Sequence, residues 1–132
     1  MKMIWLKRWF IIHCLIDVLI AVPLFIMPER LLDFCGWRTV DPVSARLVAA
    51  ALFGIGIVSF VVKDASHEVY KAMLALKIIW SFAASAALLL SLLTHAHGRP
   101  AALWIAAVIF IGFHFVWFYW YLRIQKENSI QK

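Results

Sequence analysis

The chain has 132 residues, of which 65% are hydrophobic, and a formal net charge of +6. Such a composition leaves too little polar surface for a water-soluble domain. Without that surface, the positive charge is explained better by membrane topology and anionic lipid than by nucleic-acid binding. The sequence therefore predicts an integral membrane protein that has membrane lipid, and no nucleic acid, as a partner.

Four long apolar runs fill most of the chain, at residues 9–27, 43–62, 69–93 and 101–122. As an α-helix, each run is long enough to cross ~30 Å of hydrocarbon at ~1.5 Å per residue. The connecting segments are too short to fold separately, so residues 1–132 are expected to form a single transmembrane domain. The predicted fold is all-α, an integral membrane four-helix bundle.

The first loop predicts a short helix between the first two spans. Pro28 begins a segment that runs to Cys35, its apolar positions cluster on one helical face, and Gly36 follows as a stop signal. This segment is expected to lie along the outer membrane interface. Asp41 and Pro42 then predict the N-cap and first turn of the second span.

Charged side chains gather around this loop, and they define a predicted outer-face charge network: Glu29, Asp33, Arg38, Asp41 and Arg46. Arg46 begins the second span and is expected to meet one of the three carboxylates, which would clamp the loop over the bundle. The functional alternative is that Arg38 and Arg46 hold an anionic headgroup or substrate. Basic residues near helix ends more commonly act as interfacial anchors.

Small residues predict where the spans pack. Membrane helices approach one another through small side chains, and Ala50 and Gly54 in the second span and Ser81 and Ser85 in the third have the four-residue spacing that suits this. We therefore expect the second and third spans to pack closely.

Ionisable residues inside the spans predict a polar site. His13 and Asp17 lie four residues apart on one face of the first span, Lys77 lies in the third, and His114 in the fourth. Asp17, Lys77 and His114 lie at a similar depth, ~12 Å from the presumed cytoplasmic ends of their spans. A lone charge at such depth costs ~2.5–3.5 kcal/mol on insertion scales and is relieved by a partner. We therefore predict one intramembrane cluster with an Asp17–Lys77 ion pair.

Trp80 and Ser81 follow Lys77 on the same helical face and would add an aromatic ring and a hydroxyl. The candidate ligand-binding cluster is His13, Asp17, Lys77, Trp80, Ser81 and His114. The structural alternative is that Lys77 extends to the nearby membrane surface while Asp17 bonds to a neighbouring helix and holds the bundle together.

Catalytic and cofactor motifs give weaker signals. His13 and His114 would suit haem ligation between helices, but no further haem signature accompanies them. His95 and His97 lack a nearby carboxylate or cysteine that would complete a metal site. No phosphate-binding loop, catalytic triad or zinc helix is found. No metal or resident cofactor is predicted, enzymatic activity is not favoured, and haem and quinone remain alternatives.

The distribution of Lys and Arg predicts orientation. They are more frequent in the N-terminal tail, the second loop and the C-terminal tail than in the first and third loops. Because positive loops stay cytoplasmic, both termini are predicted to face the cytoplasm of a multi-pass cell-membrane protein. Trp117, Tyr119, Trp120 and Tyr121 are then expected at the cytoplasmic interface, with an aromatic ligand cage as the alternative.

The first loop and second span also carry a family resemblance. Its elements are Pro28-Glu29-Arg30-Leu31-Leu32, Gly36-Trp37, Asp41-Pro42 and Ala45-Arg46-Leu47-Val48, which leads into a helix rich in small residues. This layout resembles small four-span prokaryotic membrane proteins of the DoxX-like kind. The resemblance implies the same architecture, and a link to respiratory or thiol-redox systems like that of some members. It offers no catalytic motif to carry over.

The sequence is compatible with three functions. The first is binding or transport of a hydrophobic or lipid-like small molecule at the intramembrane cluster. Four helices are too few to enclose a wide path, so this function predicts a homo-oligomer or a partner membrane protein. The second is an accessory or structural subunit of a membrane complex, and the third is a redox-linked membrane protein that uses quinone or haem.

Overall fold

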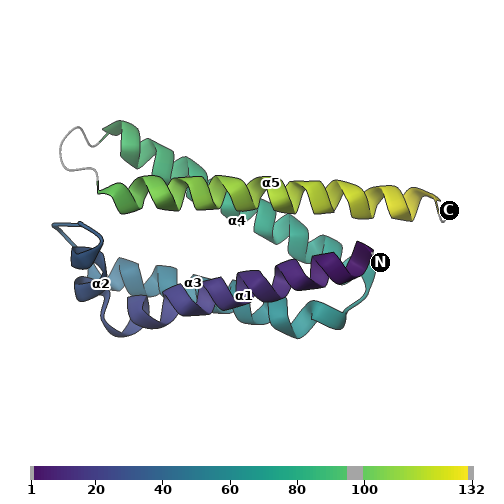
Figure 1. Cartoon of the computed structure of the whole chain (residues 1–132), viewed down its shortest axis with the longest axis horizontal. Coiled ribbons are helices and arrows are strands. Elements are labelled where there is room, and N and C mark those ends of the chain that lie inside the picture. The colour runs from purple at the N-terminus through teal and green to yellow at the C-terminus, as the bar shows by residue number, and fades with distance from the viewer. Residues whose placement is uncertain (1, 95–99, 131–132) are drawn as a thin grey trace. The chain divides into compact units, whose positions relative to one another are not determined.

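The computed structural model describes residues 2–94 and 100–130, and every regular element in that part of the chain is a helix (Figure 1). The chain divides into two compact units, Met1–Ala65 and Ser66–Lys132. A pair of long helices packed against each other forms the centre of each unit. The all-α prediction is confirmed.

The N-terminal unit contains α1 (Lys2–Ile26), α2 (Pro28–Phe34), α3 (Pro42–Val61) and the short 3₁₀ helix η1 (Val62–Asp64). Polar contacts at both ends show that α1 and α3 are antiparallel (Figure 1). At one end, Arg46 Nε donates to the carbonyl of Phe25 at 3.2 Å. At the other, Lys7 Nζ lies 2.6 Å from Asp64 Oδ1. One end of α1 is thus bonded to the start of α3, and the other end to η1, which directly follows α3.

A stripe of mostly small residues brings α3 close to α1. The buried positions of α3 recur every three or four residues: Ala45, Ala49, Leu52, Gly56 and Ser59. Ala50 and Gly54 lie on the exposed side instead, and a Cβ at Gly54 would have nothing within 4 Å. The predicted Ala50–Gly54 stripe is therefore not the surface through which α3 packs on α1.

The short helix predicted after Pro28 is confirmed as α2. It ends at Phe34, and Gly36, just after the C-cap, adopts a φ of 92°, in the left-handed region that favours glycine. The amide of Gly36 donates to the Asp33 carbonyl and that of Trp37 to the Leu32 carbonyl, both at 2.9 Å, which is a Schellman motif. Leu31 and Leu32 pack against the core between α1 and α3. The helix therefore covers part of that core, and its place at a membrane interface stays a prediction.

The predicted N-cap of α3 is also confirmed. Asp41 accepts hydrogen bonds from the backbone amides of Val43 at 3.0 Å and Ser44 at 3.3 Å, and Pro42 occupies the first turn. The Ser44 hydroxyl also donates to the carboxylate. This side-chain hydrogen bond, followed by the bond from the Val43 amide, lowers the pKa of Asp41. These bonds hold the carboxylate in its ionised form at the helix start.

The lowered pKa gives a pH-dependent prediction. An acid with a pKa that is lower in the folded state stabilises the fold above its unfolded pKa, and this contribution disappears as the pH falls through the folded pKa. Asp41→Ala is therefore expected to lower thermal stability slightly at neutral pH and to match the wild type in strong acid. Thermal unfolding in detergent at both pH values measures this, with Asp33→Ala as the control. A deficit of equal size in acid would contradict capping by the ionised carboxylate.

The C-terminal unit consists of α4 (His67–Thr94) and α5 (Ala101–Ile130) (Figure 1). The first turn of α4 follows Ser66, whose carbonyl accepts from the Tyr70 amide at 3.1 Å. The buried face of α4 includes both serines of the predicted stripe, Ser81 and Ser85. His95 and His97, weighed above as metal ligands, lie outside the described residues.

The long helices turn large apolar side chains outward. Leu19 is 77% exposed on α1, Val61 70% on α3 and Leu93 79% on α4, while buried positions on the same helices include serine, histidine, aspartate and lysine. Exposing so much apolar surface to water would be unfavourable in free energy, whereas exposing it to lipid tails is not. The pattern is that expected of helices with lipid-facing outer surfaces.

Candidate intramembrane binding site

The six residues of the predicted cluster divide between the two units. His13 and Asp17 lie on α1, whereas Lys77, Trp80 and Ser81 lie on α4 and His114 lies on α5. Four of them are buried, with exposed fractions of 7% for His13, 5% for Asp17, 1% for Lys77 and 3% for Ser81, and the other two are half-buried. Their union in one cluster, and the Asp17–Lys77 ion pair across the units, stay predictions.

On α1, the helical spacing brings His13 and Asp17 together. His13 Nδ1 lies 2.8 Å from Asp17 Oδ2, and both side chains are more than nine-tenths buried. The separation is that of an ion pair, but the contact lacks hydrogen-bond geometry. Within the described residues, Asp17 Oδ2 accepts no hydrogen bond. A buried carboxylate oxygen in this state has unused capacity to accept a hydrogen bond.

Gly56 makes room for this carboxylate between α1 and α3. A Cβ at Gly56 would lie 2.8 Å from Asp17 Cβ and 3.2 Å from Asp17 Oδ2. The side chain of Asp17 therefore occupies the space that a larger residue on α3 would fill. Sequence reasoning did not include Gly56 in the site. Its spacing of seven residues from Ala49, on the same helical face, was the signal that would have indicated it.

In the C-terminal unit, two predicted residues are in contact across the helix pair. Ser81 Oγ on α4 lies 3.1 Å from His114 Nδ1 on α5 and 3.2 Å from the carbonyl of Ile78. A hydroxyl has one proton, so a bond donated to Ile78 leaves Ser81 Oγ to accept from a protonated Nδ1. In the alternative arrangement, the hydroxyl donates to an unprotonated Nδ1.

Aromatic rings surround the His114 imidazole. The ring centroids of Phe82, Phe115 and Phe118 lie 5.9, 6.0 and 6.5 Å from it. The polar Ser81–His114 pair is therefore set in an apolar, aromatic environment. Such an environment suits a small molecule with an apolar body and one hydrogen-bonding group.

The structural alternative, in which Lys77 extends to the surface, does not hold, because Lys77 is buried. Its ammonium lies 4.8 Å from the centroid of the Trp117 ring, and both residues are only 1% exposed. A cation above a desolvated indole ring gains a favourable cation–π interaction. Sequence reasoning assigned Trp117 to an interfacial belt, but the structure makes it a buried neighbour of Lys77. Their positions in separate spans gave no sign of this contact.

The predicted outer-face charge network differs in its partners. Within the described residues, Arg46 forms no ion pair with Glu29, Asp33 or Asp41; its guanidinium instead bonds to the Phe25 carbonyl near the end of α1. The last carbonyls of a helix lack intrahelical donors and carry partial negative charge, which explains this choice. The prediction that Arg46 meets one of these three carboxylates is therefore wrong. Asp41 instead serves as the N-cap of α3.

The other members of the network line an open pocket of about 410 Å³ on the N-terminal unit. Its lining residues are Glu29, Arg30, Asp33, Trp37, Arg38 and Val40. Acidic and basic side chains occur together there, so the pocket does not select clearly for an anion. Across residues 2–94 and 100–130, this pocket included, no group of three His, Cys, Asp or Glu side chains is placed to hold a metal ion.

Candidate spans of 24 to 28 residues lie in α1, α4 and α5, and α3 together with η1 gives one of 23 residues. Even the shortest would reach about 35 Å at ~1.5 Å per residue, more than the ~30 Å hydrocarbon core. Together with outward apolar and inward polar side chains, these spans define a helical multi-pass membrane protein.

No family model, curated protein or solved structure matches the chain. The DoxX-like resemblance stays a prediction based on the first loop and the start of α3.

Proposed function

We propose that this membrane protein binds a hydrophobic or lipid-like small molecule through buried polar side chains of its spans. The observation that carries the proposal is Asp17, a carboxylate buried on an apolar helix. Its Oδ2 lies 2.8 Å from His13 Nδ1 but accepts no hydrogen bond among the described residues. An ionisable residue inside a membrane span is costly and is commonly functional. A donor on a bound molecule would supply the missing hydrogen bond.

The geometry around Asp17 indicates the chemistry of that molecule. His13 lies on one side of the carboxylate and Gly56 leaves space for it on the other. The ligand would therefore present a hydroxyl, amine or amide N–H to Asp17 Oδ2 and keep an apolar body among the surrounding side chains.

The C-terminal unit offers similar chemistry. Ser85, one helical turn after Ser81, is buried, and its hydroxyl has no hydrogen-bond partner among the described residues. With Ser81 and His114 it adds hydrogen-bonding capacity to an aromatic surface. We propose that these groups offer a second contact surface, within the C-terminal unit, for a molecule of the same kind.

The charge distribution supports a cell-membrane location with both termini in the cytoplasm. We further propose that the chain acts as a homo-oligomer or with a partner membrane protein, because four helices enclose little space. An accessory or structural subunit of a membrane complex is the second candidate. The contact of Asp17 with Gly56 favours it, since this contact also gives the carboxylate a role in helix packing.

Substitution of Asp17 tests the proposal. Native mass spectrometry of protein purified in mild detergent is expected to show an added mass on the wild type. Asp17→Asn is expected to bind the added molecule at least about tenfold more weakly, which corresponds to about 1.4 kcal/mol. The amide retains the volume of the carboxylate but loses its charge, so the fold should remain. Asp33→Asn, an exposed acidic position, is the matched control.

Three other outcomes would redirect the assignment. A wild type with no added mass, together with an Asp17→Asn variant of unchanged stability, would contradict the binding proposal and favour the accessory role. An added mass with a visible absorbance band would instead indicate haem, and an added mass that extracts as a quinone would indicate the redox-linked alternative.

A further inference from the structure

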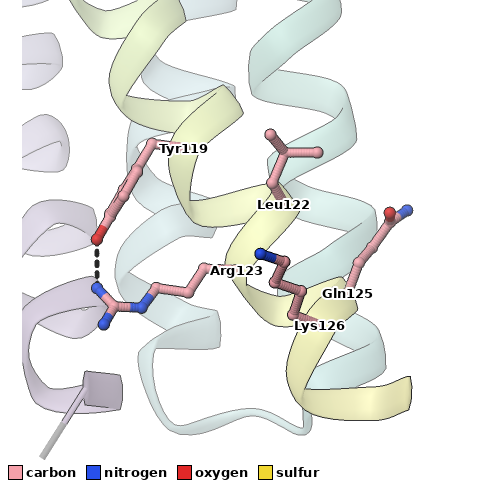
Figure 2. Close-up of a pocket in the computed structure, with 5 residues that line it drawn as sticks. All are labelled: Tyr119, Leu122, Arg123, Gln125 and Lys126. Carbon is pink, nitrogen blue, oxygen red and sulfur yellow. Dashed lines mark hydrogen bonds between the residues drawn. The ribbon is translucent and has the colours of Figure 1, made fainter. Parts of the chain in front are cut away.

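Near its C-terminal end, α5 lines an open pocket of about 700 Å³, separate from Asp17 and from the Ser81–His114 pair. Its lining residues are Tyr119, Leu122, Arg123, Gln125 and Lys126 (Figure 2). Tyr119, Arg123 and Lys126 follow one another at spacings of four and three residues, which places them along one face of the helix. Among the described side chains, the lining contains two cations and no acidic group.

Aromatic neighbours hold the Arg123 side chain. Its guanidinium donates a hydrogen bond to the Tyr119 hydroxyl, and Figure 2 shows the two side chains extending from the same side of α5. The guanidinium carbon lies 5.5 Å from the Tyr119 ring centroid and 5.8 Å from that of Trp120. A guanidinium positioned in this way loses less entropy when it binds an anion, and its planar donors suit two oxygens of one phosphate.

An apolar stripe on α5 leads to this pocket. Phe115, Phe118 and Leu122 are 66%, 46% and 47% exposed, and they are spaced by three and four residues, as is Lys126 after them. A stripe of this kind presents a continuous apolar track along a candidate span. A molecule that follows the track with hydrocarbon chains would place its polar end at Arg123 and Lys126.

We propose that the pocket binds the phosphate headgroup of an anionic phospholipid, with an acyl chain along the Phe115–Leu122 stripe. Clusters of basic residues beside a span are attracted to anionic lipid, and aromatic rings suit the headgroup boundary. The mixed charges of the pocket at Glu29, Asp33 and Arg38 show that open pockets in this protein are not all cationic. The site does not depend on Asp17, so the two proposals fail or stand separately.

The test uses delipidated full-length protein in a neutral detergent, titrated with dioleoylphosphatidylglycerol and followed by native mass spectrometry. Each basic residue near an anionic surface contributes about fivefold in affinity. Arg123→Gln and Lys126→Gln are each expected to weaken binding about fivefold, and the double variant about 25-fold. Arg38→Gln removes one positive charge from a different pocket and is the matched control.

Further titrations distinguish the possible ligands of this pocket. Dioleoylphosphatidylcholine should bind at least about fivefold more weakly than the anionic lipid, and excess inorganic phosphate should not compete. Equal binding of the two lipids, or equal weakening by Arg38→Gln, would overturn the proposal. Effective competition by inorganic phosphate would replace it with a soluble-anion site. Because Lys126 is exposed, Lys126→Gln alone provides the answer if substitution of Arg123 impairs folding.

Discussion

Gly56→Ala is expected to destabilise the N-terminal unit by about 1–3 kcal/mol, the usual cost of adding a methyl group to a packed interface. The new Cβ would lie 2.8 Å from Asp17 Cβ, closer than such atoms approach in real structures. Asp17 Cβ is attached directly to the backbone of α1, so the contact cannot be relieved by the movement of a flexible side-chain end. Relief requires α1 and α3 to separate, which also disturbs the carboxylate.

Gly54→Ala provides the matched control on the same helix. A Cβ at Gly54 meets nothing within 4 Å, and alanine is favoured over glycine in a helix by up to about 1 kcal/mol. This variant should therefore be neutral or slightly more stable. Thermal unfolding in detergent, read by circular dichroism, compares the two. Equal effects of Gly56→Ala and Gly54→Ala would contradict close packing at Gly56.

These two glycines also show what the sequence was able to predict. Length and hydropathy located the long helices, because a span needs a fixed minimum length of apolar residues. The local signals at Gly36 and Asp41 predicted the end of α2 and the start of α3, because each depends on a few neighbouring residues. The packing face of α3 was not predictable in this way. A span is apolar on all sides, so hydropathy does not distinguish the face that contains Gly56 from the face that contains Gly54.

Polar contacts of the site were predictable where they are local. His13 and Asp17 lie one helical turn apart, so helix geometry alone brings them together. The partner of Arg46 is a backbone carbonyl, a group that every residue carries, and residue type gives no sign of which carbonyl is available. The contact of Lys77 with Trp117 depends on how α4 and α5 pack. Trp117 is compatible with a belt or a buried position, and the sequence does not choose between them.

Trp117→Ala is expected to destabilise the C-terminal unit by about 3 kcal/mol, the lower end of the range for large-to-small changes in soluble cores. Lipid tails replace lost packing better than water does, which explains the choice of the lower end. The substitution removes a fully buried ring that stacks on Phe113 at 5.6 Å and lies beneath the Lys77 ammonium. Trp104→Ala, at a position that is 52% exposed, is the control and should cost much less.

A double-mutant cycle with Lys77→Met isolates the cation–π contact. If the Lys77 ammonium depends on the Trp117 ring, the loss of the ring costs less once the charge is gone, and the two changes are not additive. A coupling of about 0.5–2 kcal/mol is expected, the range for a cation above an aromatic face from exposed to desolvated sites. Unfolding of the wild type, both single variants and the double variant in the same detergent gives this value. Additive effects would contradict the contact and assign Trp117 to packing alone, whereas a coupling in the expected range would mean that the ring offsets part of the cost of burying a lysine in a span.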